Sequence, residues 1–219
     1  MSDPFTILRA GAIPLLRPNI DTDSISPGTL PPRKRAAGTE FSEHGSSTLA
    51  DDLFANWRYD GDGEPRADFV FNQPRFAGAR ILLTGANFGC GSSRESAVWM
   101  LAAWGIRCVV APSFAEIFES NCYANGVLPI ALPAETIAEL ASEAEALGAS
   151  GTFIVDLDRQ SLTAPSGRAI AFHISGFRRR GLLAGLDEIE VTLEQTAGID
   201  AYLAANRAAR PWIYAPDSH

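Results

Sequence analysis

The sequence predicts one mixed α/β domain, and two patterns of hydrophobic residues indicate it. In the middle of the chain, short apolar runs alternate with helical segments, which is typical of parallel strands linked by helices. Near the C-terminal end, two segments alternate apolar and polar residues around a Ser-Gly turn, as the strands of a hairpin do. The 219 residues are 46% hydrophobic, which is enough for one packed core. We therefore expect residues 1–219 to form a single domain.

The N-terminal third shows little regular structure. An apolar run at 12–17 predicts a short strand, and a polar turn follows it at 18–23. Residues 26–72 are irregular, with several prolines, a basic run at 33–35 and scattered glycine, serine and acidic residues. A connection this long within a compact domain is usually functional or disordered, so we expect a long irregular loop at 26–72.

Three strand–helix units are expected to follow this loop. The expected strands are 80–84, 107–111 and 127–132, and the expected helices are 93–104, 113–123 and 133–147. Strands that are separated by helices pair in parallel, because the chain must cross over between them.

The C-terminal part differs in kind. Segments 152–157 and 169–174 should form a hairpin, with the Ser-Gly turn at 166–167 between them. Two helical segments and a C-terminal tail complete the expected elements, at 178–185, 200–208 and 200–219.

Composition and charge exclude several classes of protein. The 18 basic and 26 acidic side chains leave a net charge of −8, whereas a surface that binds phosphates needs a basic field, so nucleic acid is not an expected partner. No segment approaches the roughly 20 apolar residues that cross a bilayer, and the first residues lack the pattern of a secretory signal. The three cysteines are widely spaced and form no disulfide framework. We expect a cytoplasmic protein that does not bind membranes.

The densest functional signal is the segment 85–95, which lies between an expected strand and an expected helix. The first N–H groups of a helix are unpaired and make a site for anions. Glycines such as Gly91 let the backbone approach a ligand closely. Ser92, Ser93 and Arg94 at the same place could hold a carboxylate by charge-assisted hydrogen bonds.

The same residues have a second interpretation. Ser92 and Glu95 have the S-x-x-E spacing of a helix capping box, which needs no ligand. Known nucleotide loops do not fit, because the third glycine of a dinucleotide loop would fall at Arg94 and no Gly-Lys-Ser/Thr is present.

The segment 87–95 resembles the signature of isopropylmalate isomerase small subunits, a family related to the last domain of aconitase. Other segments resemble that family's landmarks in the same order over nearly the whole chain, beginning with its early D-T-D motif and its L-F-x-x-W-R segment. They are residues 19–23, 52–58, 111–118, 121, 128–129, 177–179 and 185–187.

This resemblance implies a fold, a reaction and a partner. The fold would be a single swivelling β/β/α domain with a mixed, partly barrel-like sheet flanked by helices. The reaction would interconvert 2- and 3-isopropylmalate by dehydration and rehydration in leucine biosynthesis, with a small dicarboxylic hydroxy acid as substrate. Activity would require a heterodimer with a large subunit that carries a 4Fe-4S cluster.

The resemblance also implies roles for individual residues. Ser92 would take the proton from the carbon beside the carbinol, and Ser93, Arg94 and the backbone at Gly91 would hold a substrate carboxylate. Asp23, the second acid of the D-T-D motif, would lie at the active site, although an Asx turn or helix cap explains an aspartate there equally well. Arg35 lies where the related aconitase domain has a substrate arginine, but an exposed basic run is commonly only solvated.

No metal is expected in this chain. Cys90, Cys108 and Cys122 lack the close spacing of iron–sulfur ligands, and Cys108 lies in an apolar strand, where a free cysteine is usually buried. The family's cluster ligands belong to the large subunit.

Some positions depart from the family pattern. Ser96 replaces a histidine that is frequent in the family, and Ser26 stands where an aliphatic residue is usual. Loops carry specificity, so two alternatives stay open. One is a small subunit of a related methylmalate or dimethylmaleate hydratase, and the other is a stand-alone module that binds carboxylates.

Overall fold

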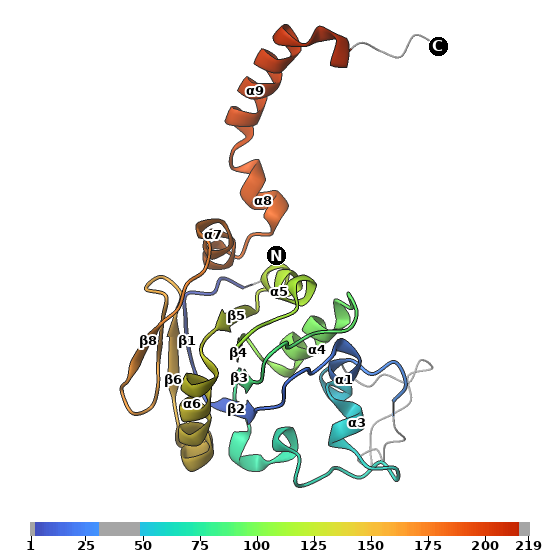
Figure 1. Ribbon diagram of the computed structural model, residues 1–219, viewed down its shortest axis with the longest axis vertical. Helices are drawn as coiled ribbons and strands as arrows, with labels where there is room; N and C mark the ends of the chain where they lie inside the picture. Colours follow the sequence, from blue (N-terminus) through green and yellow to red (C-terminus); the bar gives the residue numbers. More distant parts are fainter. Residues whose placement is uncertain (1–2, 31–48, 215–219) are drawn as a thin grey trace.

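The computed structural model describes residues 3–30 and 49–214, and its strands form two four-stranded sheets (Figure 1). The parallel sheet has the order β2 (Ala12–Leu15), β3 (Ile81–Thr84), β4 (Cys108–Ala111) and β5 (Leu128–Ala131). The antiparallel sheet has the order β1 (Ile7–Ala10), β6 (Phe153–Asp156), β7 (Ser161–Thr163) and β8 (Ala169–Ala171). The expected α/β class is confirmed, with parallel and antiparallel strands in separate sheets.

Both faces of the parallel sheet are covered. Helices α4 (Ser96–Trp104) and α5 (Glu116–Ala124) pack on one face, where Leu82 belongs to their hydrophobic cluster. Helix α6 (Ala134–Leu147) and the antiparallel sheet pack on the other face, against Ile81 and Leu83 (Figure 1). A parallel sheet that is buried on both sides needs continuous apolar strands, which explains why these strands were visible in the sequence.

The carboxyl ends of β2 and β3 lie at the same edge of the parallel sheet, because Ala12 pairs with Ile81 and Leu15 with Thr84. The segments that follow these two strands therefore emerge side by side. In open α/β sheets this edge is where ligands bind.

The described parts of the expected 26–72 loop contain short helices, α2 (Leu49–Asp52) and α3 (Ala55–Arg58), which the sequence did not predict. The buried Arg58 side chain holds this segment together. Its Nη1 donates hydrogen bonds to the carbonyl oxygens of Ala50 at 3.1 Å and Leu53 at 3.3 Å. Its Nε donates to Oδ1 of Asn72 at 3.1 Å, and its guanidinium lies 4.4 Å from the centre of the Trp104 ring.

Replacing Arg58 with alanine should lower the free energy of unfolding by about 3 kcal/mol, because buried carbonyl groups lose a charged donor. Urea denaturation followed by circular dichroism would measure this loss. Arg159→Ala is the matched control, since its side chain is 83% exposed and its loss should change stability by less than about 0.5 kcal/mol. Equal stabilities of the two variants would contradict a structural role for Arg58.

The C-terminal strands differ from the expected hairpin. The segment predicted at 152–157 pairs with β1 and β7, not with β8, so the predicted pairing of 152–157 with 169–174 is wrong. The hairpin is formed by β7 and β8, around the expected turn at 166–167. Strand β7 was missed because it has three residues and a single buried side chain, Leu162.

Three helices follow the antiparallel sheet: α7 (Gly176–Ala184), α8 (Glu188–Leu193) and α9 (Thr196–Ala209). Helices α7 and α9 confirm the two predicted helical segments, whereas α8 was not predicted. Helices α8 and α9 form an arm that extends away from the sheets (Figure 1). The arm and the turn after it expose large apolar side chains, among them Ile189, Leu193, Tyr202, Leu203, Trp212 and Ile213.

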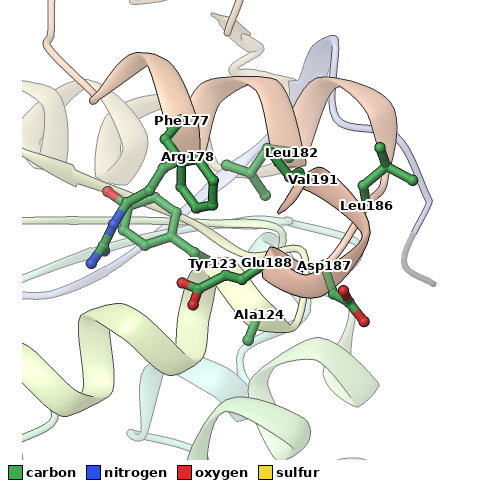
Figure 2. Close-up of a pocket in the computed structure, with 10 residues that line it drawn as sticks. Tyr123, Ala124, Phe177, Arg178, Leu182, Leu186, Asp187, Glu188 and Val191 are labelled. Atoms are coloured by element: carbon green, nitrogen blue, oxygen red, sulfur yellow. The ribbon is translucent and has the colours of Figure 1, made fainter. Parts of the chain in front are cut away.

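A small pocket lies at the root of this arm, between α5, α7 and α8 (Figure 2). The Arg178 guanidinium lies 4.2 Å from the centre of the Tyr123 ring, and the Tyr123 hydroxyl donates to Glu119 at 3.2 Å. Burial, and then the Glu119 carboxylate, raise the pKa of Tyr123, so its hydroxyl stays protonated and keeps this bond. These contacts join α7 to α5.

Candidate active site

Two segments meet at the carboxyl edge of the parallel sheet. One follows β2 and includes the short helix α1 (Thr22–Ile25), and the other is the loop 85–95 that follows β3. Three backbone hydrogen bonds join them: Asn19 N–H donates to the Ala86 carbonyl at 2.8 Å, Gly89 N–H to Ile20 at 2.8 Å, and Thr22 N–H to Cys90 at 2.9 Å. The D-T-D motif and the glycine-rich loop therefore form one structural unit.

Glycines allow this close approach. Gly89 has φ of +75°, and a Cβ atom added there would lie 2.0 Å from Cγ of the Phe118 ring. Gly91 has φ of +97°, and a Cβ atom there would lie 3.3 Å from Cβ of Asp21. Other residues rarely adopt this left-handed backbone, so both positions favour glycine.

Replacing Gly89 with alanine should destabilise the chain by about 4 kcal/mol, because the left-handed backbone and the clash with Phe118 add together. Thermal unfolding would report this as a large decrease in Tm. Gly61→Ala is the matched control, because Gly61 has no heavy atom within 4 Å of an added Cβ. A Gly89 variant as stable as that control would mean that the loop has another conformation.

Ser92 contacts Thr22 through both its side chain and its backbone. The two side-chain oxygens lie 2.7 Å apart, and the Ser92 N–H donates to Oγ1 of Thr22 at 3.2 Å. Thr22 is 1% exposed, whereas Ser92 is exposed. An exposed residue, Ser92, is therefore held through its hydroxyl and its backbone by a buried hydroxyl.

The capping box, one of the two interpretations of this segment, does not form. Helix α4 begins at Ser96, three residues later than predicted, and its N-cap residue Glu95 makes no side-chain capping bond. The Glu95 carboxylate instead accepts a hydrogen bond from Nδ2 of Asn125 at 2.9 Å. Ser92 bonds to Thr22 instead, so the contact between the two segments determines the conformation of the turn before α4. The predicted start of this helix, at residue 93, is therefore wrong.

The turn before α4 still presents unpaired donors. In the described parts of the chain, no acceptor is present for the N–H groups of Ser93, Arg94 and Glu95. All three residues are exposed. Such a turn could bind an anion through its backbone, although it precedes the helix rather than opening it.

Asp23 and Arg94 form an ion pair, so the structure brings together two predicted site residues that lie 71 positions apart in the sequence (94 − 23). The same Nη1 atom of Arg94 donates to the carbonyl oxygen of Ser26 at 3.4 Å. Among the residues that the structure describes, no acceptor faces Nε or Nη2 of Arg94, which leaves donors for a carboxylate.

The other predicted site residues have different positions. Ser93 and Gly91 lie on the same exposed turn as Ser92, so the loop residues form one surface. Arg35 lies outside the described residues. The Asx-turn interpretation applies to Asp21, not to Asp23, because the Asp21 side chain accepts from the Ser24 N–H at 2.7 Å and caps α1.

The two positions that depart from the family pattern contact one another. The side-chain oxygens of Ser26 and Ser96 lie 2.9 Å apart, and Ser26 is buried. Since the carbonyl of Ser26 also receives the hydrogen bond from Arg94, this serine pair connects α4 to the part of the site that holds the guanidinium.

Thr22 was not a predicted site residue, although it lies inside the D-T-D motif. Charged residues are the usual candidates for an active site, so Asp23 was predicted. The residue that bonds to Ser92, however, is the neutral Thr22. The position of Thr22 between Asp21 and Asp23, the acids of the D-T-D motif, is the feature of the sequence that could have pointed to it.

The cysteines of this chain do not suit an iron–sulfur cluster. Cys108 and Cys122 are buried in the hydrophobic clusters on opposite faces of the parallel sheet, and burial raises the pKa of both thiols. Within residues 3–30 and 49–214, no group of three or more His, Cys, Asp or Glu side chains could hold a metal ion. The same residues include no helix that is long and apolar enough to span a membrane.

Comparisons with known proteins agree on one family. Residues 18–135 match the model of the aconitase C-terminal domain. The chain is 46% identical to a 3-isopropylmalate dehydratase small subunit of Dinoroseobacter shibae, over 96% of this chain and 100% of that protein. It is 47% identical to a protein of the same name from Cupriavidus necator, over 97% and 98%. A crystal structure of 3-isopropylmalate dehydratase from Methanocaldococcus jannaschii has the same fold, with a TM-score of 0.57, 22% identity, and coverage of 90% of this chain and 98% of that one.

Proposed function

This chain belongs to the family of 3-isopropylmalate dehydratase small subunits, and from that premise we propose that it supplies the proton-abstracting and carboxylate-binding half of a two-subunit hydro-lyase. The substrates would be 2- and 3-isopropylmalate, which are interconverted through their shared alkene. One observation carries the proposal: the Ser92 hydroxyl and the Arg94 guanidinium lie on one exposed turn, beside the Asp23 carboxylate.

The proposed roles follow from the chemistry of elimination. Ser92, as an alkoxide, would take a proton from the carbon next to the carbinol carbon, and the electrons of that C–H bond would form the double bond. Hydroxide would leave from the carbinol carbon. To complete the isomerisation, hydroxide would add to the other carbon of the alkene, and Ser92 would return its proton to the carbon that lost the hydroxyl.

Arg94 and the turn around it would hold the substrate in place. The donors of Arg94 that have no acceptor among the described residues, together with the N–H groups of Ser93 and Glu95, favour binding of a carboxylate. Asp23 would hold the guanidinium in the required direction through its ion pair. The partner would complete the rest of the site, and Arg35 would add a further positive charge for the substrate.

The partner would be a large subunit that holds the 4Fe-4S cluster and so supplies the Lewis acid for the leaving hydroxyl. The names of the relatives support the existence of such a partner, because they are small subunits. The pair would act in the cytoplasm.

Reconstitution tests the proposal. This chain is mixed anaerobically with the large subunit after its cluster has been assembled, and the interconversion of 2- and 3-isopropylmalate is followed. Turnover should require both chains. Preferential turnover of methylmalate or dimethylmaleate would instead favour the related hydratase, and calorimetric binding of malate by the isolated chain without any turnover of the pair would favour a carboxylate-binding module.

A further inference from the structure

We infer that Thr22 is a positioning residue for Ser92, and that its hydroxyl donates a hydrogen bond which stabilises the deprotonated serine. This inference rests on the proposed function of Ser92 as the base. Thr22 is one of four buried polar or charged side chains among the described residues. It is the buried polar side chain that touches the proposed base.

The protons at this contact can be accounted for. Oγ1 of Thr22 accepts the N–H of Ser92 at 3.2 Å, which occupies one of its lone pairs. Its own proton then has two possible acceptors, the Ser92 side-chain oxygen at 2.7 Å and the Ser92 carbonyl oxygen at 3.3 Å. The shorter distance is the ordinary length of an O–H···O hydrogen bond, whereas the longer one is weak.

The direction of the bond changes when Ser92 loses its proton. Between two neutral hydroxyls either oxygen can donate, but an alkoxide has no proton to give. Thr22 must then be the donor, and a bond from a hydroxyl to an anionic oxygen is shorter and about twice as strong as one between neutral groups. The contact therefore favours the alkoxide over the alcohol and lowers the pKa of the Ser92 hydroxyl.

The position of Thr22 is well determined. Its N–H donates to the Cys90 carbonyl at 2.9 Å, and the preceding residue, Asp21, caps the helix that Thr22 begins. A β-branched side chain on a helix has few rotamers, so the hydroxyl has little freedom to turn away. Water does not compete for its proton, because the side chain is buried.

Stabilising the alkoxide should increase the rate. Each unit by which the pKa falls towards the working pH increases the alkoxide population tenfold, while the accompanying loss of basicity costs less than tenfold. A hydrogen bond to a charged group corresponds to about a 10- to 100-fold effect on that equilibrium.

Thr22→Val tests the inference in the reconstituted two-subunit enzyme, because valine keeps the shape and removes the hydroxyl. We expect the rising limb of the pH–rate profile to move to higher pH by about one to two units. We expect kcat for 3-isopropylmalate to fall by about 5- to 50-fold, less than the change in alkoxide population because the remaining alkoxide is more basic, with KM changed less than about threefold. Thr22→Ser keeps the donor and should restore kcat to within about threefold of the wild type. A merely structural role would change KM, assembly or Tm without moving the pH profile.

A second pair of variants isolates the contact. In a Ser92→Ala background, Thr22→Val should reduce the residual rate by less than about twofold, since the group on which Thr22 acts is gone. If Thr22→Val does not assemble, Thr22→Cys replaces it, because a thiol is a weak donor. Its kcat should fall at least about fivefold, with a shift of the pH profile in the same direction.

The outcomes separate this inference from the proposed function. A wild-type complex without turnover on any hydroxy dicarboxylic acid would overturn both. Turnover by the wild type, loss of turnover in Ser92→Ala, and wild-type kcat with an unchanged pH profile in Thr22→Val would overturn the role of Thr22 alone.

Discussion

Replacing Ser92 with alanine should reduce kcat of the two-subunit enzyme by about 1,000-fold while the subunits still assemble. The proposed base contributes its effect in the transition state, where general base catalysis typically supplies about 10²- to 10⁴-fold. KM should change little, because substrate carboxylates would be held mainly by Arg94 and the neighbouring N–H groups. Steady-state kinetics with 3-isopropylmalate and a pull-down of the large subunit would measure the two quantities.

Ser93→Ala is the matched comparison, since it makes the same change at the next position of the same exposed turn. Ser93 is proposed to bind a carboxylate, so its loss should increase KM by about tenfold and leave kcat within about threefold. The reverse pattern, with Ser93→Ala inactive and Ser92→Ala active, would identify Ser93 as the base. Undiminished turnover in both variants would mean that neither Ser92 nor Ser93 abstracts the proton, which would contradict the proposed role of this chain.

The parallel sheet could be predicted from the sequence because its strands are apolar and three of them, β3, β4 and β5, are each followed by a predicted helix. The antiparallel sheet was predicted less well. Strand β1 has four residues that alternate between exposed and buried side chains, and β7 has only three residues. Alternation over so few residues also occurs outside strands, so neither strand could be recognised from its hydrophobic pattern. Their positions depend on pairing with β6, a contact between distant segments that no local pattern contains.

The sequence predicted which residues belong to the candidate site, but it did not predict the contacts between them. The segment after Gly91 contains both a capping-box pattern and a ligand-binding pattern, and local sequence does not decide between them. The structure shows the reason: Thr22 lies 70 residues away in the chain and occupies the Ser92 side chain, so the cap is lost. The pairing of Asp23 with Arg94 and of Ser26 with Ser96 also spans the two segments that follow β2 and β3.

The Ser26–Ser96 contact gives a physical interpretation of the two departures from the family pattern. A small hydroxyl at both positions lets the side chains meet at 2.9 Å, and a histidine at 96 would occupy that space. Since the carbonyl of Ser26 also accepts from Arg94, a change at either serine is transmitted to the guanidinium through one residue. Ser26 and Ser96, which were expected to depart from the family pattern, therefore lie together beside the proposed carboxylate site.

Replacing Arg94 with glutamine should reduce kcat/KM by about 1,000-fold, because the proposed carboxylate site would lose its charge and the fork of donors that fits a carboxylate. Arg94→Lys separates charge from shape: a lysine keeps the charge but not the planar fork, so its kcat/KM should fall by about 100-fold. Asp23→Asn tests the ion pair, and its effect should be smaller than that of either change, since the substrate carboxylate would still find the guanidinium. The matched control is Arg159→Gln, an exposed arginine outside the site whose loss should leave kcat/KM unchanged. If Arg94→Lys were as active as the wild type, a single positive charge would be sufficient to bind the carboxylate. The proposal that Arg94 binds the substrate in a bidentate manner would then be wrong.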